Sequence, residues 1–153
     1  MKLQEKVNAT LPCDKYYYVT EEEILTKCLA DDYIMLLVYD KDKLVAASFA
    51  CKHGLFFERL ITDWVKLEGN KIMCHEFVIV DIGYRGCDIQ QRFMNATIRE
   101  ARAMGYDAIW CCAHHDNTPS VVSITKCGYM AIKQFVVNDC LGTYITEKYK
   151  SLT

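Results

Sequence analysis

Residues 78–90 have the residue types of an anion-binding turn. An apolar run ends at Val80, a turn containing Gly86 follows, and helical spacing begins directly afterwards. The first N–H groups of a helix have no partner within the helix and lie at the positive end of its dipole. Arg85 and Arg92 add positive charge nearby. The segment therefore predicts a site for a phosphate or pyrophosphate, although many strand-to-helix turns bind nothing.

A second group of chemically active residues is Cys111, Cys112, His114 and His115. Thiolates and imidazoles bind zinc, but successive residues of a strand point to opposite faces, so only alternate members could converge on one ion. Buried thiols and a histidine pair in a loop are the favoured interpretation, and no metal site is predicted. No cysteine lies in a turn that would activate it as a nucleophile. Either histidine could contact a substrate.

Two further patterns follow one another between about residues 74 and 135. The first is a strand ending in valine, a short turn and an Arg-Gly pair at the start of a helix. The second is an asparagine before a helix that a Gly-aromatic pair closes. The matching residues are Val80, Tyr84, Arg85, Gly86, Ile89 and Gln90 in the first pattern, and Asn117, Ser120, Gly128 and Tyr129 in the second. Together with Glu76, these patterns resemble the GNAT superfamily of acyl-CoA-dependent N-acetyltransferases.

The resemblance implies that acetyl-CoA binds as a co-substrate between the strands that end near Val80 and Ala113. The residues that it implicates in cofactor binding are Val78, Ile79, Val80, Arg85, Gly86, Cys87, Asp88, Ile89, Gln90, Asn117 and Ser120. Backbone groups of Val78 and Val80 would pair with the pantetheine arm, and the amides of residues 85–90 would hold the pyrophosphate. A primary amine of a small molecule or peptide would attack the thioester directly, and a backbone N–H would stabilise the oxyanion.

Glu76 is the catalytic residue that the resemblance implies. The attacking amine must first lose a proton to a carboxylate near the strand, directly or through water. Many members of the family have Glu at the matching position. The alternative interpretation is a carboxylate that faces solvent or forms a salt bridge.

Three positions depart from the family pattern. Asp88 stands where the family has a glycine that lets the backbone approach the phosphates. Two like charges about 5 Å apart repel by roughly 3 kcal/mol at an effective dielectric constant near 20, so Asp88 would weaken CoA binding. Its carboxylate could also cap the helix amides and occupy the anion site itself. Gly83 replaces an Arg or Gln, and Ile124 replaces the Tyr that protonates the leaving thiolate, so no general acid is assigned.

These departures leave alternative functions open. The first alternative is a catalytically degenerate GNAT-fold module that binds a partner or regulates, with CoA binding weakened by Asp88. A second alternative, which is less favoured, is a thiol- or metal-responsive protein that uses its cysteines.

The elements that must position these residues follow from hydrophobic spacing and turn residues. Helices are predicted over residues 20–30, 87–104 and 117–126, and strands over residues 33–39, 44–51, 72–80, 107–113, 129–137 and 141–148. Residues 54–68 are ambiguous, and residues 72–80 form the central strand because they are apolar on both faces. The order predicts an α/β (mixed α+β) fold. Its central mixed, mostly antiparallel sheet is GNAT-like, has helices on both faces and forms one domain over residues 1–153.

Composition narrows the class of protein further. The chain has 153 residues, a net charge of −2, 52% hydrophobic residues and nine cysteines. The charge gives no basic field for nucleic acid, and the apolar runs are too short to cross a membrane. The absence of a signal-peptide pattern and of a disulfide framework favours a reducing cytoplasm. Sheet edges and the apolar segment 54–67 are consistent with a homodimer. The run of tyrosines at residues 16–18 could line a groove, but it is expected to pack against the sheet.

Overall fold

The structure is a computed structural model, and it describes residues 2–13, 16–17, 19–52, 71–137 and 140–149. The helices are α1 (Lys2–Asn8), α2 (Glu22–Cys28), α4 (Ile89–Ala103) and α5 (Thr118–Lys126), with a short 3-10 turn, η2 (Ile82–Tyr84). The strands are β1 (Tyr33–Asp40), β2 (Lys43–Cys51), β3 (Ile72–Val80), β4 (Ala108–His114), β5 (Met130–Val137) and β6 (Cys140–Tyr149). Each predicted helix and strand is confirmed within a few residues. The ambiguous segment 54–68 lies outside the described residues, and α1 is an element that the sequence analysis does not predict.

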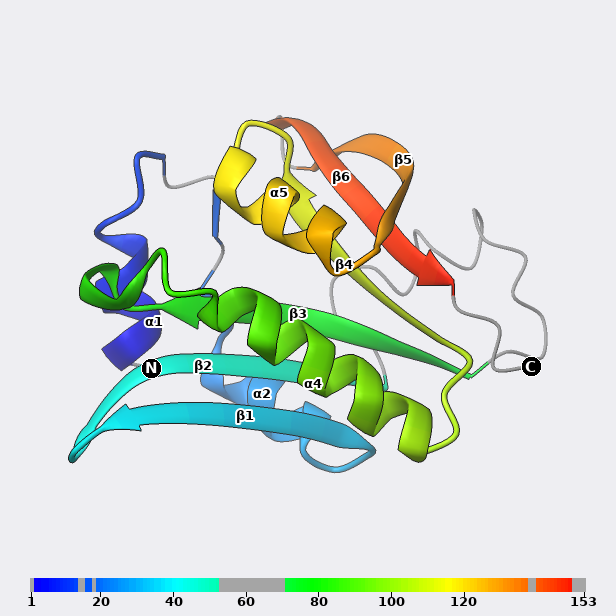
Figure 1. The fold of residues 1–153 in the computed structure, drawn as a ribbon, viewed down its shortest axis with the longest axis horizontal. Helices are drawn as coiled ribbons and strands as arrows, with labels where there is room; N and C mark the ends of the chain where they lie inside the picture. Colours follow the sequence, from blue (N-terminus) through cyan, green and yellow to red (C-terminus); the bar gives the residue numbers. More distant parts are fainter. Residues whose placement is uncertain (1, 14–15, 18, 53–70, 138–139, 150–153) are drawn as a thin grey trace.

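The described strands form one six-stranded sheet in the order β1-β2-β3-β4-β6-β5 (Figure 1). Within it β3 and β4 are parallel, whereas the other neighbouring pairs are antiparallel. Helices α4 and α5 cover one face, and α1 and α2 cover the other. The predicted fold class, a mixed and mostly antiparallel sheet with helices on both faces, is confirmed.

Strand β3 lies between two apolar clusters. On the α4 and α5 face, Met73 packs with Met94 and Ile124 in the larger cluster. On the opposite face, Phe77 packs with Phe49 in a smaller cluster that includes residues of α1 and α2. Burial of apolar surface on both sides stabilises β3, because each fully buried side chain contributes about 1.5–3 kcal/mol. The central position predicted for this strand is confirmed.

Helix α1 is held to the end of β3 by a buried carboxylate. Asp81 Oδ2 lies 2.6 Å from Lys6 Nζ and 3.0 Å from Lys43 Nζ. The Asp81 side chain is 4% exposed, and hydrogen bonds from both lysines lower its pKa to about 2. Val7 adds an apolar contact on the same face. Asp81 therefore joins α1, β2 and the end of β3 at one point.

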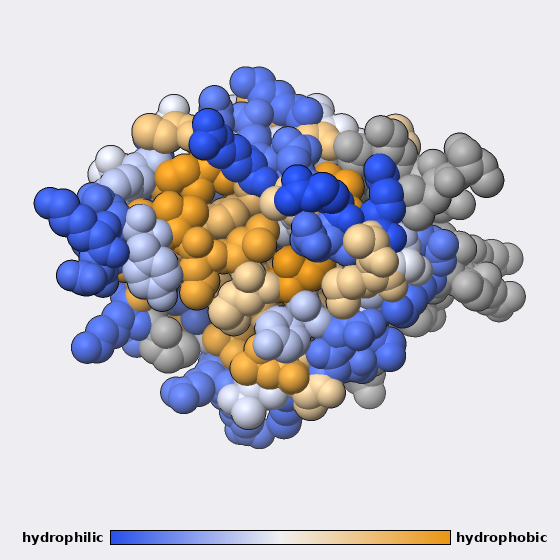
Figure 2. Space-filling model, turned by 60° about the horizontal axis from the view of Figure 1, so that its bottom comes forward, coloured by the Kyte–Doolittle hydropathy of each residue, from blue (hydrophilic) through white to orange (hydrophobic). Residues whose placement is uncertain are grey.

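Strand β1 forms one edge of the sheet and exposes alternate apolar side chains. Tyr33, Met35, Leu37 and Tyr39 are each exposed by 41% or more. Figure 2 turns this edge toward the viewer and shows hydrophobic surface beside hydrophilic surface. Among the described helices, none is both long enough and apolar enough to span a bilayer.

Candidate functional site

A pocket lies where β3 and β4 separate. The two strands pair in parallel from Ile72 and Ala108 only as far as His75 and Cys111. Strand β3 continues to Val80 and β4 to His114. Residues 76–80 of β3 and Cys112 and Ala113 of β4 line a cavity of about 450 Å³. Lining residues come from both faces of the sheet, including α1, α4 and α5. The separation exposes strand backbone to the cavity, where a ligand could pair with it as an added strand does.

Glu76 lies at a β-bulge beside this separation. Phe77 pairs with Phe49 and His75 pairs with Ala50 on β2, so Glu76 is an extra residue in β3. A bulge redirects the local side chains, and bulges are common next to active sites. Glu76 is partly buried and lines the pocket. The position predicted for a catalytic carboxylate therefore faces the cavity.

Thiols surround the Glu76 carboxylate. The Cys51 thiol donates to Glu76 Oε1 at 3.8 Å, and Cys51 Sγ lies 3.4 Å from Cys28 Sγ. Burial raises the pKa of Cys74 and Cys112 well above the ordinary value, and the negative charge of Glu76 adds to both shifts. Cys74 and Cys112 therefore remain protonated at neutral pH and are poor nucleophiles.

The turn before α4 has two residues, Gly86 and Asp88, in the left-handed backbone conformation that glycine adopts readily. Gly86 has φ +79°, and an added Cβ would find no atom within 4 Å. Asp88 has φ 56° and ψ 14° at the N-cap position. Its side chain does not cap the helix; instead Oδ1 accepts a hydrogen bond from Gln91 Nε2 at 3.2 Å. The expectation that Asp88 caps the α4 amides is therefore wrong, and these amides are left available to an anion.

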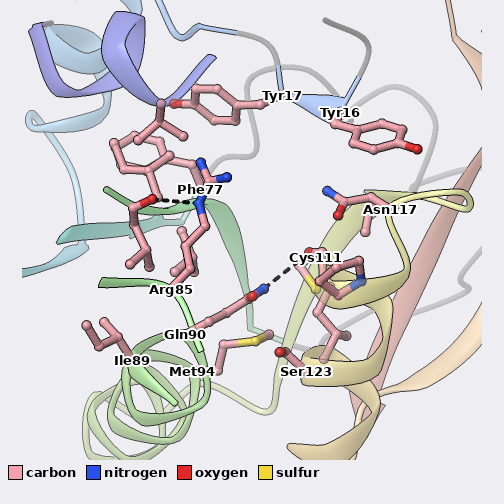
Figure 3. A pocket seen from close by; sticks show the side chains of 18 of the residues that line it. Tyr16, Tyr17, Phe77, Arg85, Ile89, Gln90, Met94, Cys111, Asn117 and Ser123 are labelled. Carbon is pink, nitrogen blue, oxygen red and sulfur yellow. Dashed lines mark hydrogen bonds between the residues drawn. The ribbon is translucent and has the colours of Figure 1, made fainter. Parts of the chain in front are cut away.

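Arg85 folds back from this turn toward the end of β3. Its Nε donates to the carbonyl oxygen of Val80 at 3.1 Å, and its Nη2 donates to Thr10 Oγ1 at 2.9 Å. Figure 3 shows Arg85 at the wall of the pocket. Arg85 thus joins the turn to the segment after α1. It also binds the Val80 carbonyl, one of the backbone groups that the resemblance assigns to pantetheine.

Gln90 and Ser120 connect the two helices across the pocket. Gln90 Nε2 donates to Ser120 Oγ at 3.2 Å, joining the first turn of α4 to the first turn of α5. Asn117 precedes α5 and lies on the same side of the cavity as Ser123 (Figure 3). Ile124 is buried in the pocket wall, so it supplies no acid at the position where the family has Tyr.

Most of the predicted site residues come together in this pocket. The lining includes Glu76, Val78, Ile79, Val80, Arg85, Gly86, Asp88, Ile89, Gln90, Asn117 and Ser120. Cys87 is exposed outside the lining, and its thiol contacts the Arg85 carbonyl oxygen at 3.9 Å. The segment after α1 forms a further wall that includes Tyr16 and Tyr17, so these two tyrosines line a groove, which was the alternative to packing against the sheet; Tyr18 lies outside the described residues. Tyr17 does pack against the sheet as expected, because its ring meets Phe77 edge-on.

The histidines next to the pocket are held by local partners. His75 is buried, bonds Ser48 Oγ through Nε2 at 2.7 Å, and has its pKa lowered to about 4 by burial. His114, His115 and Asp116 offer ligand atoms within 4.8 Å of one another. However, His114 Nδ1 accepts from the Asp116 amide, and His115 Nε2 lies 3.0 Å from Asp116 Oδ1. We assign no metal to this turn.

Comparison with known proteins identifies the fold. No family model and no curated protein sequence matches the chain. Solved structures do match: Arabidopsis thaliana NAA60 in complex with acetyl-CoA has a TM-score of 0.72 at 13% identity, over 97% of this chain and 91% of that one. The chain has the fold of the GNAT acetyltransferases.

Two bacterial structures extend the likeness. Smu.2055 from Streptococcus mutans UA159 has a TM-score of 0.71 at 15% identity, over 97% of this chain and 91% of that chain. The ribosomal-protein-S18-alanine N-acetyltransferase from Escherichia coli has a TM-score of 0.70 at 12% identity, over 99% and 86% respectively. In each case the likeness spans nearly the whole of this chain.

Proposed function

We propose that the protein is an N-acetyltransferase that moves an acetyl group from acetyl-CoA to a primary amine. The observation that carries the proposal is the pocket between β3 and β4, which joins the bulged Glu76 to the uncapped start of α4. Structural neighbours in complexes with acetyl-CoA and with CoA share the fold and support the proposal. The open space at Gly86 and the uncapped amides fit a pyrophosphate, whereas the carboxylate of Asp88 opposes one.

The residues of the pocket divide the chemistry between its two halves. The α4 amides and the open turn at Gly86 would bind the pyrophosphate. Glu76 would take a proton from the ammonium group, directly or through water, so that the amine nitrogen can bond to the acetyl carbon. As the carbon–sulfur bond breaks, a backbone N–H of β3 would stabilise the oxyanion, and the thiolate would take its proton from solvent.

Calorimetric titration of acetyl-CoA into the reduced protein tests binding, and an amine-dependent assay of thiol release tests transfer. We expect micromolar binding. Glu76→Gln should keep that binding and lose at least a hundredfold in transfer rate, because general-base catalysis contributes about 10²–10⁴-fold. Glu100→Gln, an exposed carboxylate on α4, is the matched control and should leave both unchanged. Equal transfer by Glu76→Gln would remove Glu76 from the mechanism.

A second candidate function is a non-catalytic module in which the cofactor half of the pocket is blocked. Asp88 places a carboxylate in the pocket lining at the start of α4, and the hydrogen bond from Gln90 to Ser120 crosses the same half. Absence of binding at millimolar acetyl-CoA would favour this candidate. The expectations of a cytoplasmic protein and of a homodimer stay predictions. Light scattering on the purified protein measures the latter.

A further inference from the structure

The half of the pocket on the α1 and α2 face has apolar and aromatic walls. Its described apolar and aromatic lining residues are Val7, Leu11, Pro12, Tyr16, Tyr17, Phe77 and Ile79. Tyr17 packs with the apolar cluster of this face, which also contains Val7 and Phe77. Figure 3 shows Tyr16 and Tyr17 across the cavity from Gln90 and Met94. Glu76 belongs to this half, since Cys51, its thiol neighbour, is part of the same cluster.

The two tyrosines present their rings to the pocket because other residues bind their hydroxyls. The Tyr17 hydroxyl donates to Gln4 Oε1, and its ring centroid lies 6.3 Å from that of Phe77 at 81°. The Tyr16 hydroxyl donates to the Asp116 carbonyl oxygen at 3.1 Å, and its ring lies 5.3 Å from the His114 ring. These contacts hold Tyr16 and Tyr17 in place. The surface offered to a ligand is aromatic carbon rather than hydroxyl.

In this half of the pocket, Glu76 is the acidic side chain that can pair with an ammonium group. Glu76 is the single acidic residue among the described residues that line it. The guanidinium of Arg85 is bound to the Val80 carbonyl and Thr10, and Lys6 is paired with Asp81. An acceptor with one ammonium group suits this arrangement. A second ammonium group would lie against apolar walls without a described carboxylate to pair with it.

We propose that the acceptor is a primary monoamine whose substituent next to the amine is aromatic or aliphatic. The inference rests on the proposed function and names its substrate class. The amine lies at Glu76, and the substituent packs against Tyr17, Phe77 and the turn after α1. The same chemistry is found in free alkylamines and arylalkylamines and in peptides whose first residue is apolar, so the test includes both sources.

The test measures kcat/KM, with acetyl-CoA saturating, for a series from propylamine to hexylamine and for phenethylamine, ethanolamine and spermidine. Each added methylene that packs against an apolar wall should raise kcat/KM about fourfold. Phenethylamine should exceed ethanolamine and spermidine by at least tenfold. Peptides beginning with Leu or Phe, compared with Ser and Asp, show which source the protein uses.

Substitutions at Tyr17 link the preference to this wall. Tyr17→Ala should lower kcat/KM for phenethylamine about tenfold and leave ethanolamine within twofold, whereas Tyr17→Phe keeps the ring and the preference. Tyr39→Ala, an exposed tyrosine on β1, is the matched control.

The outcomes distinguish a failure of this substrate class from a failure of the proposed acetyltransferase function. A flat alkylamine series, or a preference for spermidine or ethanolamine, overturns the inference while transfer itself stands. Acetyl-CoA binding without turnover of any of these amines or peptides also overturns it. Failure to bind acetyl-CoA overturns the proposed function instead.

Discussion

Asp88 combines backbone strain and negative charge at the start of α4. A non-glycine residue in the left-handed region costs about 1 kcal/mol, although Asp tolerates it better than most. We expect Asp88→Gly to raise the free energy of unfolding by about 1 kcal/mol and to bind CoA at least tenfold more tightly. Asp88→Asn keeps the side-chain shape and removes the charge, so it isolates the electrostatic part. Calorimetry and urea unfolding measure both effects.

The control for this prediction is Asp42→Asn, which removes an exposed carboxylate in the β1–β2 turn. Improved CoA binding by Asp88→Gly but not by Asp88→Asn would assign the effect to bulk and backbone. An unchanged dissociation constant in both variants would show that the carboxylate does not reach the anion site.

Gln90 supports a second prediction at the scale of one residue. The bond from Gln90 to Ser120 must open if a ligand passes between α4 and α5, and a neutral hydrogen bond contributes about 0.5–1.5 kcal/mol. Gln90→Ala should therefore bind CoA roughly three- to tenfold more tightly, and Ser120→Ala should show the same direction. Asn95→Ala, an exposed amide on α4, is the control in the same titration. Weaker binding by Gln90→Ala would mean that the Gln90 amide itself contacts the ligand.

At the scale of elements, the positions of the strands and helices of the site can be predicted from the sequence. The way in which the strands pair in the sheet cannot. The order strand, turn, helix, strand and helix over residues 72–126 follows from apolar runs and helix-closing glycines. Separation of β3 from β4 after His75 depends on contacts between distant segments. The bulge at Glu76 depends on register against β2, which no local pattern encodes. Asp88 is predicted as a departure from the pattern, but the direction of its side chain is not.

Helix α1 shows why an element can be missed. Its seven residues are mostly polar, and such a short helix is marginal on its own in water. Tertiary contacts stabilise it: Gln4 and Val7 are buried, and Lys6 pairs with Asp81. Local hydrophobic periodicity therefore does not predict α1 or the pocket wall that α1 supports.

Gln4 allows a prediction about this element. Its Oε1 accepts from the Tyr17 hydroxyl and from the Thr20 amide at 2.9 Å, and its Nε2 donates to the Thr20 carbonyl at 3.3 Å. Gln4→Leu leaves these groups without that partner in a buried place, so the free energy of unfolding should fall by about 2 kcal/mol. Urea unfolding measures the loss, with Glu5→Gln on the exposed side of α1 as control. A loss below about 0.5 kcal/mol would show that water replaces the Gln4 amide.

At the scale of the whole molecule, the pocket joins two differently built halves of one sheet. The α4 and α5 face contributes the larger apolar cluster and the uncapped helix turn, and the α1 and α2 face contributes aromatic walls. Strand β3 lies between them, and Glu76 of this strand lines the pocket that the two halves share. The same strand region carries two titratable groups, His75 and Asp81, whose lowered pKa values link the stability of the sheet to pH.

His75 and Asp81 predict a two-stage loss of stability in acid. The pKa of His75 is lowered from 6.5 to about 4, so the unfolded chain binds a proton first, and stability falls as the pH drops from about 6.5 to 4. The loss is on the order of 3 kcal/mol. The pKa of Asp81 is lowered from 3.8 to about 2, so its contribution is present above pH 3.8 and is lost as the pH falls toward 2.

Urea unfolding from pH 7 to pH 2.5 should resolve the two stages. His75→Gln should flatten the stability profile between pH 6.5 and 4, and Asp81→Asn should flatten only the part below about pH 4. Because the two groups titrate in different windows, each variant is the control for the other. His75→Gln lowers stability at pH 7 if the Ser48 hydrogen bond is impaired, but the slope against pH reports the proton alone. A slope that His75→Gln leaves unchanged would show that His75 is not the group that binds the first proton.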